Sequence, residues 1–480
     1  MSDQWRGEHG TRGAQLPLRP QPTVSTGSER PDRPLPASRW VVAALVYGLM
    51  IVEGICQGGF WPADALLGGL GALVLLGAAL VTNPPGRRDT VVVVSLLLLA
   101  AWWAVRAATT GLASHVLPLG ASIVAFAAAF AAARTLQGRT RQAAGLAVAC
   151  LGAAGALVGF AGLVWRWFPE AMPAQGLWRL ASTLTYADAA GLVLGVCLLL
   201  ALGSDLVPWL TRVTVCLCAG GLLATQSRGA YVALFAACAI VPWHRYRRFA
   251  VPLLAGAALG AAAIVTSPHV GRVPWLGTVL VLAVAVAGLS KWEPRGVGSG
   301  LGGRVALGAA AAVGLAGVVV LLRHELALRA FAPSDQDRSV EWSTALHQWW
   351  SAPLLGVGPD RLLVFHATDG TYARFVHNEY LQVAADGGVI ACVLLLFTIL
   401  SIARVVRRVD VLSSCATSAL VCWAVGAAFD FDWHLTFVGF LGGWCLALAH
   451  GKKGTGEASP RGRHRRRAVG GVVRSPVPPR

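Results

Sequence analysis

Long apolar runs separated by short polar segments dominate the sequence between Trp40 and about His450. Roughly fourteen of these runs are long enough, or nearly long enough, to cross a bilayer as an α-helix, which needs about 20 residues. Two of them flank residue 227 closely and could form one broken element. The pattern therefore predicts an all-α, polytopic bundle of about 12–14 transmembrane helices.

Three polar segments stand outside this pattern. Residues 1–38 and 451–480 are rich in arginine, proline and glycine, which predicts disordered tails around a transmembrane domain at 39–450. The third segment is a long loop at 323–385. Within it, residues 339–350 carry tryptophans at mixed helical spacing, which predicts an amphipathic helix in the membrane interface.

Composition supports a membrane protein: 55% of the residues are hydrophobic, 13% are charged, and the mean hydropathy is +0.61. The net charge of +17 could indicate nucleic-acid binding, but the basic residues lie in the tails and in short connections. We therefore expect the lipid bilayer as their partner, and no nucleic acid. All ten cysteines fall in or beside apolar runs without a CxxC pair, so we expect neither disulfides nor a metal site.

The distribution of arginine and lysine predicts the orientation. With the N-terminus in the cytoplasm, thirty of the forty basic residues fall on the cytoplasmic side and five in the short loops opposite. Positive charge accumulates on the cytoplasmic side of membrane proteins. We expect a multi-pass plasma-membrane protein with both termini in the cytoplasm. The loop 323–385, with five arginines, and the residues discussed next would then face outward.

Ser227, Arg228 and Gly229 begin a predicted helix at the outer face. A serine N-cap with exposed amides favours an anion, and an arginine fork suits phosphate. Gly229 would let a bulky group approach the backbone. The alternative is an arginine that only reaches to the interface beside a capping serine.

His377 lies before another predicted helix, followed by Asn378, Glu379 and Tyr380. Histidine can act as a base near neutral pH, and the amide and carboxylate could orient it or bind sugar hydroxyls. The alternative is a histidine that only anchors the helix at the interface. Glu379 and Asp386 could form a glycosidase acid pair, but neither their spacing nor their context supports it.

Arg338 precedes the amphipathic helix, and Asp188 lies about one turn inside a predicted helix. A carboxylate there is costly, so Asp188 could pair with an arginine. Glu53 is also intramembrane, and no role follows for it. Because the outer face has no pool of ATP or nucleotide sugars, an enzyme there needs a donor with its own leaving group, such as a lipid-linked diphosphate.

Together these residues resemble the O-antigen ligase and polymerase superfamily over about residues 180–450. The resemblance rests on Thr225–Tyr231, Arg338 with Trp342, Pro353–Gly358, His377–Leu381 and Gly388. It implies transfer of a glycan from undecaprenyl diphosphate to an acceptor hydroxyl, without a metal, cofactor or nucleotide. Arg228 and Arg338 would bind the diphosphate and stabilise the leaving group. His377 would contact the acceptor or the diphosphate, with a general-base role as one option.

We further expect Ser227, Gly229, Asn378, Glu379, Tyr380 and Asp188 to bind substrate. Relatives often carry asparagine where this chain has Asp188, so its role stays open. The acceptor could be a glycan, a lipid or a protein, and both ligation and polymerisation are compatible with the motifs. A lipid-linked-sugar flippase would need polar groups at the bilayer midplane. A peptidoglycan-type polymerase would need a carboxylate in the long loop, such as Asp360 or Asp369.

Overall fold

Fifteen α-helices follow one another in the residues that the computed structural model describes: 37–110, 113–174, 176–290, 334–366 and 371–450. These residues belong to one unit, Pro36–Gly454. The predicted tails lie outside the described residues, apart from the start of the first helix at Ala37. Asp369 and one of the roughly fourteen apolar runs of the sequence, at about 304–322, also lie outside them.

Before residue 300 the helices are α1 (Ala37–Ile55), α2 (Pro62–Thr82), α3 (Arg87–Thr109), α4 (Leu117–Ala133), α5 (Gly138–Trp165), α6 (Ala187–Leu202), α7 (Pro208–Thr225), α8 (Arg228–Cys238), α9 (Trp243–Arg248), α10 (Ala250–Thr266) and α11 (Pro274–Leu289). After it come α13 (Ser334–Ser351), α14 (Glu379–Val405), α15 (Val411–Gly426) and α16 (Thr436–Ala449). Short 3₁₀ turns are η1 (Gln57–Gly59), η2 (Ala113–Val116), η3 (Ser182–Leu184) and η4 (Asp432–His434). Two antiparallel hairpins pair β1 (Ala171–Ala174) with β2 (Leu177–Leu180), and β3 (Val364–His366) with β4 (Thr371–Ala373). The predicted all-α class is confirmed, and the hairpins are an addition that the apolar pattern does not predict.

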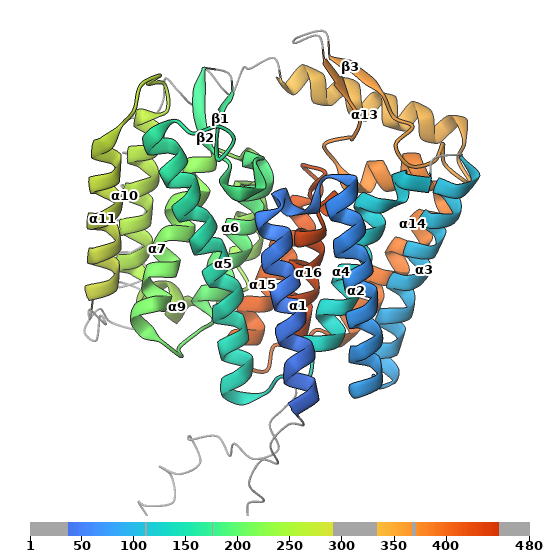
Figure 1. Cartoon of the computed structure of the whole chain (residues 1–480), viewed down its shortest axis with the longest axis horizontal. Helices are drawn as coiled ribbons and strands as arrows, with labels where there is room; N and C mark the ends of the chain where they lie inside the picture. The colour runs from blue at the N-terminus through green and yellow to red at the C-terminus, as the bar shows by residue number, and fades with distance from the viewer. Residues whose placement is uncertain (1–36, 111–112, 175, 291–333, 367–370, 451–480) are drawn as a thin grey trace, which may run out of the picture. The chain divides into compact units, whose positions relative to one another are not determined.

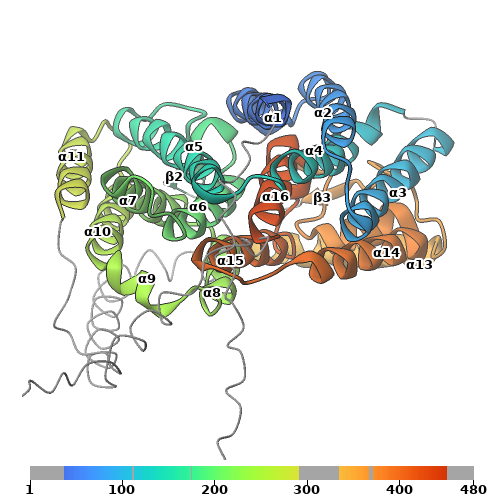
Figure 2. The same ribbon diagram turned by 90° about the horizontal axis from the view of Figure 1, so that it is seen from below.

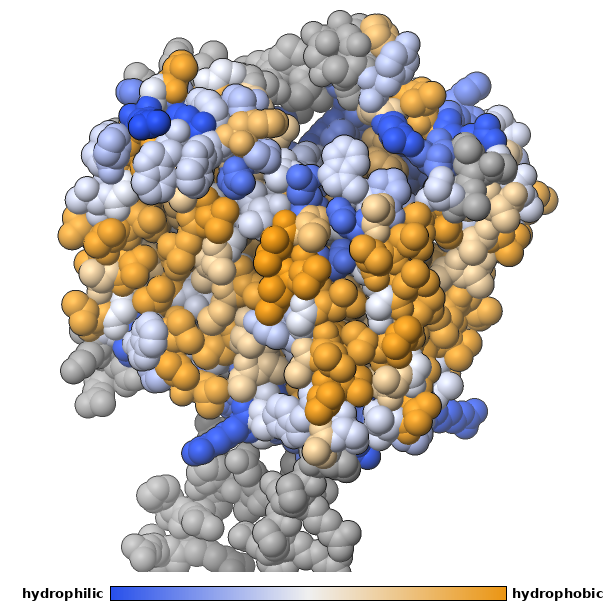
Figure 3. All heavy atoms as spheres, in the orientation of Figure 1, coloured by the Kyte–Doolittle hydropathy of each residue, from blue (hydrophilic) through white to orange (hydrophobic). Residues whose placement is uncertain are grey.

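Seven of the helical segments are long and apolar enough to cross a membrane, and six shorter apolar helices accompany them. The thirteen apolar helices fall within the expected range. In space filling, apolar side chains form a broad band between two polar ends (Figure 3). The chain is therefore a multi-pass membrane protein. Helix α13 and both hairpins lie at the same end of the bundle (Figure 1).

The centre of the bundle is the contact between α4 and α16. Every residue of α16 is buried, and two of its glycines, Gly439 and Gly443, face α4. A methyl group at either position would collide with a backbone carbonyl of α4, that of Ser122 or that of Phe126. Small residues four positions apart let membrane helices approach closely, so this pair sets the distance between α4 and α16.

A kink in α14 holds the chain that follows α13. Gly388 has a φ of +66°, and a side chain there would collide with the Leu354 carbonyl. The Val389 amide donates to the Pro353 carbonyl at 2.8 Å, and the Gly358 amide donates to the Asp386 carbonyl at 3.0 Å. These contacts pack the segment after α13 onto α14, which itself lies beside α3 (Figure 2).

The helix pair around residue 227 is a broken element, as the sequence suggests. Gln226 ends α7 in the left-handed region, with a φ of +53°. The Ser227 hydroxyl then accepts a hydrogen bond from the Ala230 amide at 3.3 Å, which confirms the predicted N-cap of α8. The second of the two apolar runs, which the sequence places at about 229–243, does not form a single helix, because α8 ends at Cys238 and α9 is a separate short helix. With 11 residues, α8 is only about 16 Å long.

Candidate active site

Polar residues that the sequence singles out gather under α13, beside the N-termini of α6 and α8. They enclose a narrow pocket lined by Asp188, Leu192, Ser227, Gly229, Ala230, Arg338, Gly426, Phe429, Asp430 and Asp432. Four of the nine predicted site residues therefore line one pocket, although they come from three separate helices.

The first turn of α8 forms one wall of this pocket. A methyl group at Gly229 would lie 2.8 Å from the Phe429 Cβ, so the close approach that glycine permits is to a neighbouring side chain. Arg228 is exposed and does not line the pocket, but it belongs to the same helical turn. The backbone amides of this turn carry partial positive charge, as at any helix N-terminus.

Asp188 pairs with an arginine, as expected, and the partner is Arg179 on β2. The guanidinium donates to both carboxylate oxygens, at 2.7 and 3.4 Å. The Nε of Arg179 also donates to the Thr225 carbonyl at 2.8 Å, so the hairpin is tied to the end of α7. Arg179 therefore neutralises Asp188, and Arg228 and Arg338 are not needed for that purpose.

Arg338 projects from α13 into a group of acidic side chains. Burial lowers the pKa of its guanidinium, but the charges of Asp430, Tyr186 and Asp188 outweigh burial and raise it. The Tyr186 hydroxyl donates to both oxygens of Asp430, at 2.9 and 2.8 Å. Arg338 is thus a permanent, half-buried positive charge at the pocket.

Asp430 and Asp432 give the pocket unusual protonation behaviour. Burial raises the pKa of Asp430 to about 6, against the opposing effects of His377 and Arg338. Burial and the neighbouring carboxylates raise the pKa of Asp432 well above its ordinary value. Both carboxyl groups therefore bind a proton more readily than an exposed aspartate does.

His377 lies next to this group and is held by Glu341 of α13. Its backbone amide and its ring Nδ1 both donate to the Glu341 Oε2, at 3.0 and 2.7 Å. The ring also contacts the edge of Phe431, with 5.4 Å between centroids. Burial lowers the pKa of His377, but the Glu341 hydrogen bond and the Asp430 charge outweigh it, and the pKa is raised.

The three residues after His377 make contacts within the protein. Asn378 caps α14 by accepting from the Leu381 amide at 3.1 Å. Glu379 is fully buried and accepts from the Trp433 amide at 2.6 Å, with His434 Nδ1 at 3.1 Å. The Tyr380 hydroxyl donates to a carbonyl of α15 at 2.7 Å. It is therefore Glu341 that holds the His377 ring, while these residues hold α14 against α15 and η4.

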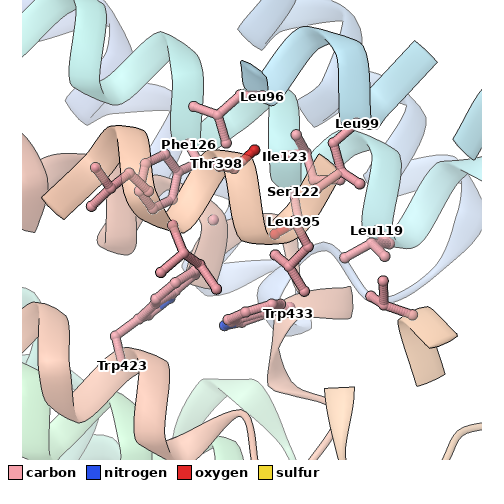
Figure 4. Close-up of a pocket in the computed structure, with 14 residues that line it drawn as sticks. Leu96, Leu99, Leu119, Ser122, Ile123, Phe126, Leu395, Thr398, Trp423 and Trp433 are labelled. Atoms are coloured by element: carbon pink, nitrogen blue, oxygen red, sulfur yellow. The ribbon is translucent and has the colours of Figure 1, made fainter. Parts of the chain in front are cut away.

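An apolar pocket also borders η4. Trp433 lines this pocket, and the preceding residue, Asp432, lines the polar one. Trp423 and Trp433 face leucines and a phenylalanine of α3 and α4 across a cavity of about 60 Å³ (Figure 4). Ser122 and Thr398 are its only hydroxyl residues. This surface suits hydrocarbon and offers nothing that would recognise a charged head group.

Sequence reasoning misses several residues of the site. Glu341 carries a usable signal, because it lies three positions after Arg338 and so shares its helical face. The turn Asp430–His434 also stands out in the sequence as a charged turn on the predicted outer face, but its two aspartates are not among the predicted site residues. Tyr186 carries no signal, because its partner Asp430 lies 244 positions further along the chain.

Asp360 and Asp386, two carboxylates of the rival hypotheses, line a different pocket. Asp360 contacts His115 and Arg374. Asp386 accepts from the Gln382 amide at 2.6 Å and is not part of the pocket around Arg338. Glu53 is buried with its carboxylate against Gly59 and Gly68, and its Oε2 has no hydrogen-bond partner among the described residues.

Residues 269–396 match the family model described as O-antigen ligase. The matched segment contains Arg338, Glu341 and His377, whereas the turn at Ser227–Gly229 lies before it. The comparison with curated proteins finds no match.

Proposed function

The match over residues 269–396 supports membership of the O-antigen ligase superfamily, and on this premise we propose that the protein is a membrane glycosyltransferase. It transfers a glycan from an undecaprenyl-diphosphate-linked donor to an acceptor hydroxyl, by ligation or by polymerisation. The observation that carries the proposal is the convergence of Arg338 and the start of α8 at one pocket, with the His377–Glu341 pair close to Asp430 of its lining.

The donor diphosphate binds at Arg338, Arg228 and the amides of the first turn of α8. An arginine fork makes paired hydrogen bonds to phosphate oxygens and stabilises the charge that develops on a leaving diphosphate. Arg179 already neutralises Asp188, and the raised pKa values of Asp430 and Asp432 weaken the repulsion of an anion. The apolar pocket beside η4 offers hydrocarbon contacts next to this charged site.

His377 activates the acceptor. Because the Glu341 carboxylate accepts from Nδ1, the Nε2 of a neutral His377 is left to accept a proton from the attacking hydroxyl. Glu341 also stabilises the imidazolium that this proton transfer forms, as carboxylates do behind catalytic histidines. Ser227, Asn378 and Glu379 support this centre by fixing the two helix starts that flank it.

The site faces the outside of the plasma membrane, and both termini lie in the cytoplasm. The excess of basic residues in the tails and in alternate connections supports this orientation. A lipid-linked diphosphate fits it, because such a donor brings its own leaving group to a compartment without nucleotides.

The proposal is tested with purified protein in lipid nanodiscs and a synthetic undecaprenyl-diphosphate tetrasaccharide. We expect undecaprenyl diphosphate to be released only when an acceptor is present, either a second donor molecule or a glycan with a free hydroxyl. The measurement is the amount of undecaprenyl diphosphate over time. Donor binding without release, for every acceptor supplied, would contradict a transferase and favour a flippase.

A second prediction concerns Glu341→Gln. Removing the carboxylate charge lowers the raised pKa of His377. Since the neutral imidazole is the active form, activity rises with pH through this pKa, and the acidic limb of the rate profile should move to lower pH in the variant. The plateau rate should also fall, because the imidazolium loses its stabilising charge. Ser343→Ala, on the exposed face of α13, is the control and should leave the profile unchanged.

A further inference from the structure

A second polar cavity of about 240 Å³ is lined in part by Phe375, two residues before His377, and no step of the proposed transfer uses it. Its walls come from the start of α2, from η2, from the segments after α13 and β4, and from α14 and η4. Aromatic rings and ionisable side chains line it together, chiefly Phe60, Trp61, His115, Asp360, Phe375 and Asp386.

A row of aromatic rings joins this cavity to the transfer site. Tyr186, which bonds Asp430, stacks on Phe431 with 5.2 Å between centroids, and Phe431 stacks on Phe375 at 5.3 Å. Phe375 contacts Phe60 at 6.4 Å, and Phe60 contacts Trp61 at 5.6 Å. Trp61 is 55% exposed, so the row runs from the buried pocket to the surface of the protein.

The charged side chains of the cavity pair within the protein, and one oxygen of Asp386 stands apart. Arg374 donates to both carboxylate oxygens of Asp360, and His115 Nε2 lies 3.1 Å from Asp360 Oδ2. Asp386 is 1% exposed, and Gln382 donates to its Oδ2. Its Oδ1 is buried and has no hydrogen-bond partner among the described residues. A buried carboxylate oxygen without a donor is costly, which points to a donor supplied by a ligand.

We propose that this cavity binds uncharged, hydroxyl-rich sugar units of a glycan, beside the centre where transfer takes place. The inference rests on the proposed function. Sugar rings stack their C–H faces on aromatic rings, and their hydroxyls donate to carboxylates such as Asp386. An anionic ligand fits poorly, because two carboxylates line the cavity and its arginine, Arg374, is already paired with Asp360. The glycan is either that of the donor or that of the acceptor.

Equilibrium binding to the full-length protein in nanodiscs tests this assignment. The probes are undecaprenyl diphosphate carrying one neutral hexose, the same lipid carrying a linear neutral tetrasaccharide, and the free tetrasaccharide. We expect Trp61→Ala and Asp386→Asn to weaken binding of a tetrasaccharide probe by about five- to tenfold, and to leave the one-hexose donor unchanged. Trp167→Ala is the matched control, since Trp167 is 58% exposed and lies at the end of α5.

The two tetrasaccharide probes distinguish the sources of the glycan. Weaker binding of the lipid-linked tetrasaccharide alone assigns the cavity to the donor, and weaker binding of the free tetrasaccharide assigns it to the acceptor. If Trp61→Ala binds both tetrasaccharide probes as tightly as the unaltered protein, the proposal is overturned. Trp61 lies at the surface, so we expect this variant to fold even if Asp386→Asn does not. The readout needs no turnover, so failure of the transfer assay with intact glycan binding would count against the proposed function and not against this cavity.

Discussion

Replacing His377 by alanine is expected to lower the rate of undecaprenyl diphosphate release by about 10²–10⁴-fold, the usual contribution of a general base. The expectation follows from the hydrogen bond between His377 Nδ1 and Glu341, which leaves Nε2 to accept a proton. The affinity for the donor should change little, because Arg338 and the start of α8 hold the diphosphate in this proposal.

The measurement therefore combines the release rate with the donor dissociation constant. His347→Ala is the matched control, since His347 lies exposed on α13 and should leave both quantities unchanged. A large loss of donor affinity in His377→Ala would instead make His377 a ligand of the diphosphate. A release rate equal to that of the unaltered protein would contradict any role in transfer.

The fold could be predicted from the sequence because membrane helices can be recognised by the length and apolar character of their segments. The exceptions have physical causes. In the sequence the apolar run that corresponds to α14 covers about residues 386–403. It ends close to the end of the helix at Val405 but begins after its start at Glu379, because the first two turns of α14 carry buried polar residues. The hairpins β1–β2 and β3–β4 are three or four residues per strand, too short for an alternating pattern to stand out.

The parts of the site that could be predicted are those in which a residue acts on its immediate neighbours in the sequence. Ser227 can be predicted as a cap because capping is local, and its structure agrees. The pairs that build the pocket are not local: Tyr186 and Asp430 are 244 positions apart, and His377 and Glu341 are 36 apart. Pairs so far apart cannot be predicted from one sequence by itself. Phe375 and Trp61 are likewise far apart in the sequence, and they are connected through Phe60 only in the folded chain.

Arg338→Lys is expected to reduce transfer by about 10²-fold, a loss typical of removing one oriented donor from a charged transition state. The substitution keeps the positive charge, so Asp430 and Glu341 retain a neutralising neighbour and the fold should persist. What the lysine loses is the planar fork, which alone can contact two phosphate oxygens at once. Donor affinity and release rate should therefore both fall, in contrast to His377→Ala.

Arg361→Lys provides the comparison, because Arg361 is an exposed arginine of the same loop that bonds the Thr110 carbonyl. It should behave like the unaltered protein, and thermal unfolding in detergent should be the same for both variants. Full activity in Arg338→Lys would mean that position 338 needs only a positive charge and not the planar guanidinium group. The diphosphate would then have to be recognised by the amides of α8 and by Arg228, and Arg228→Lys would become the decisive variant.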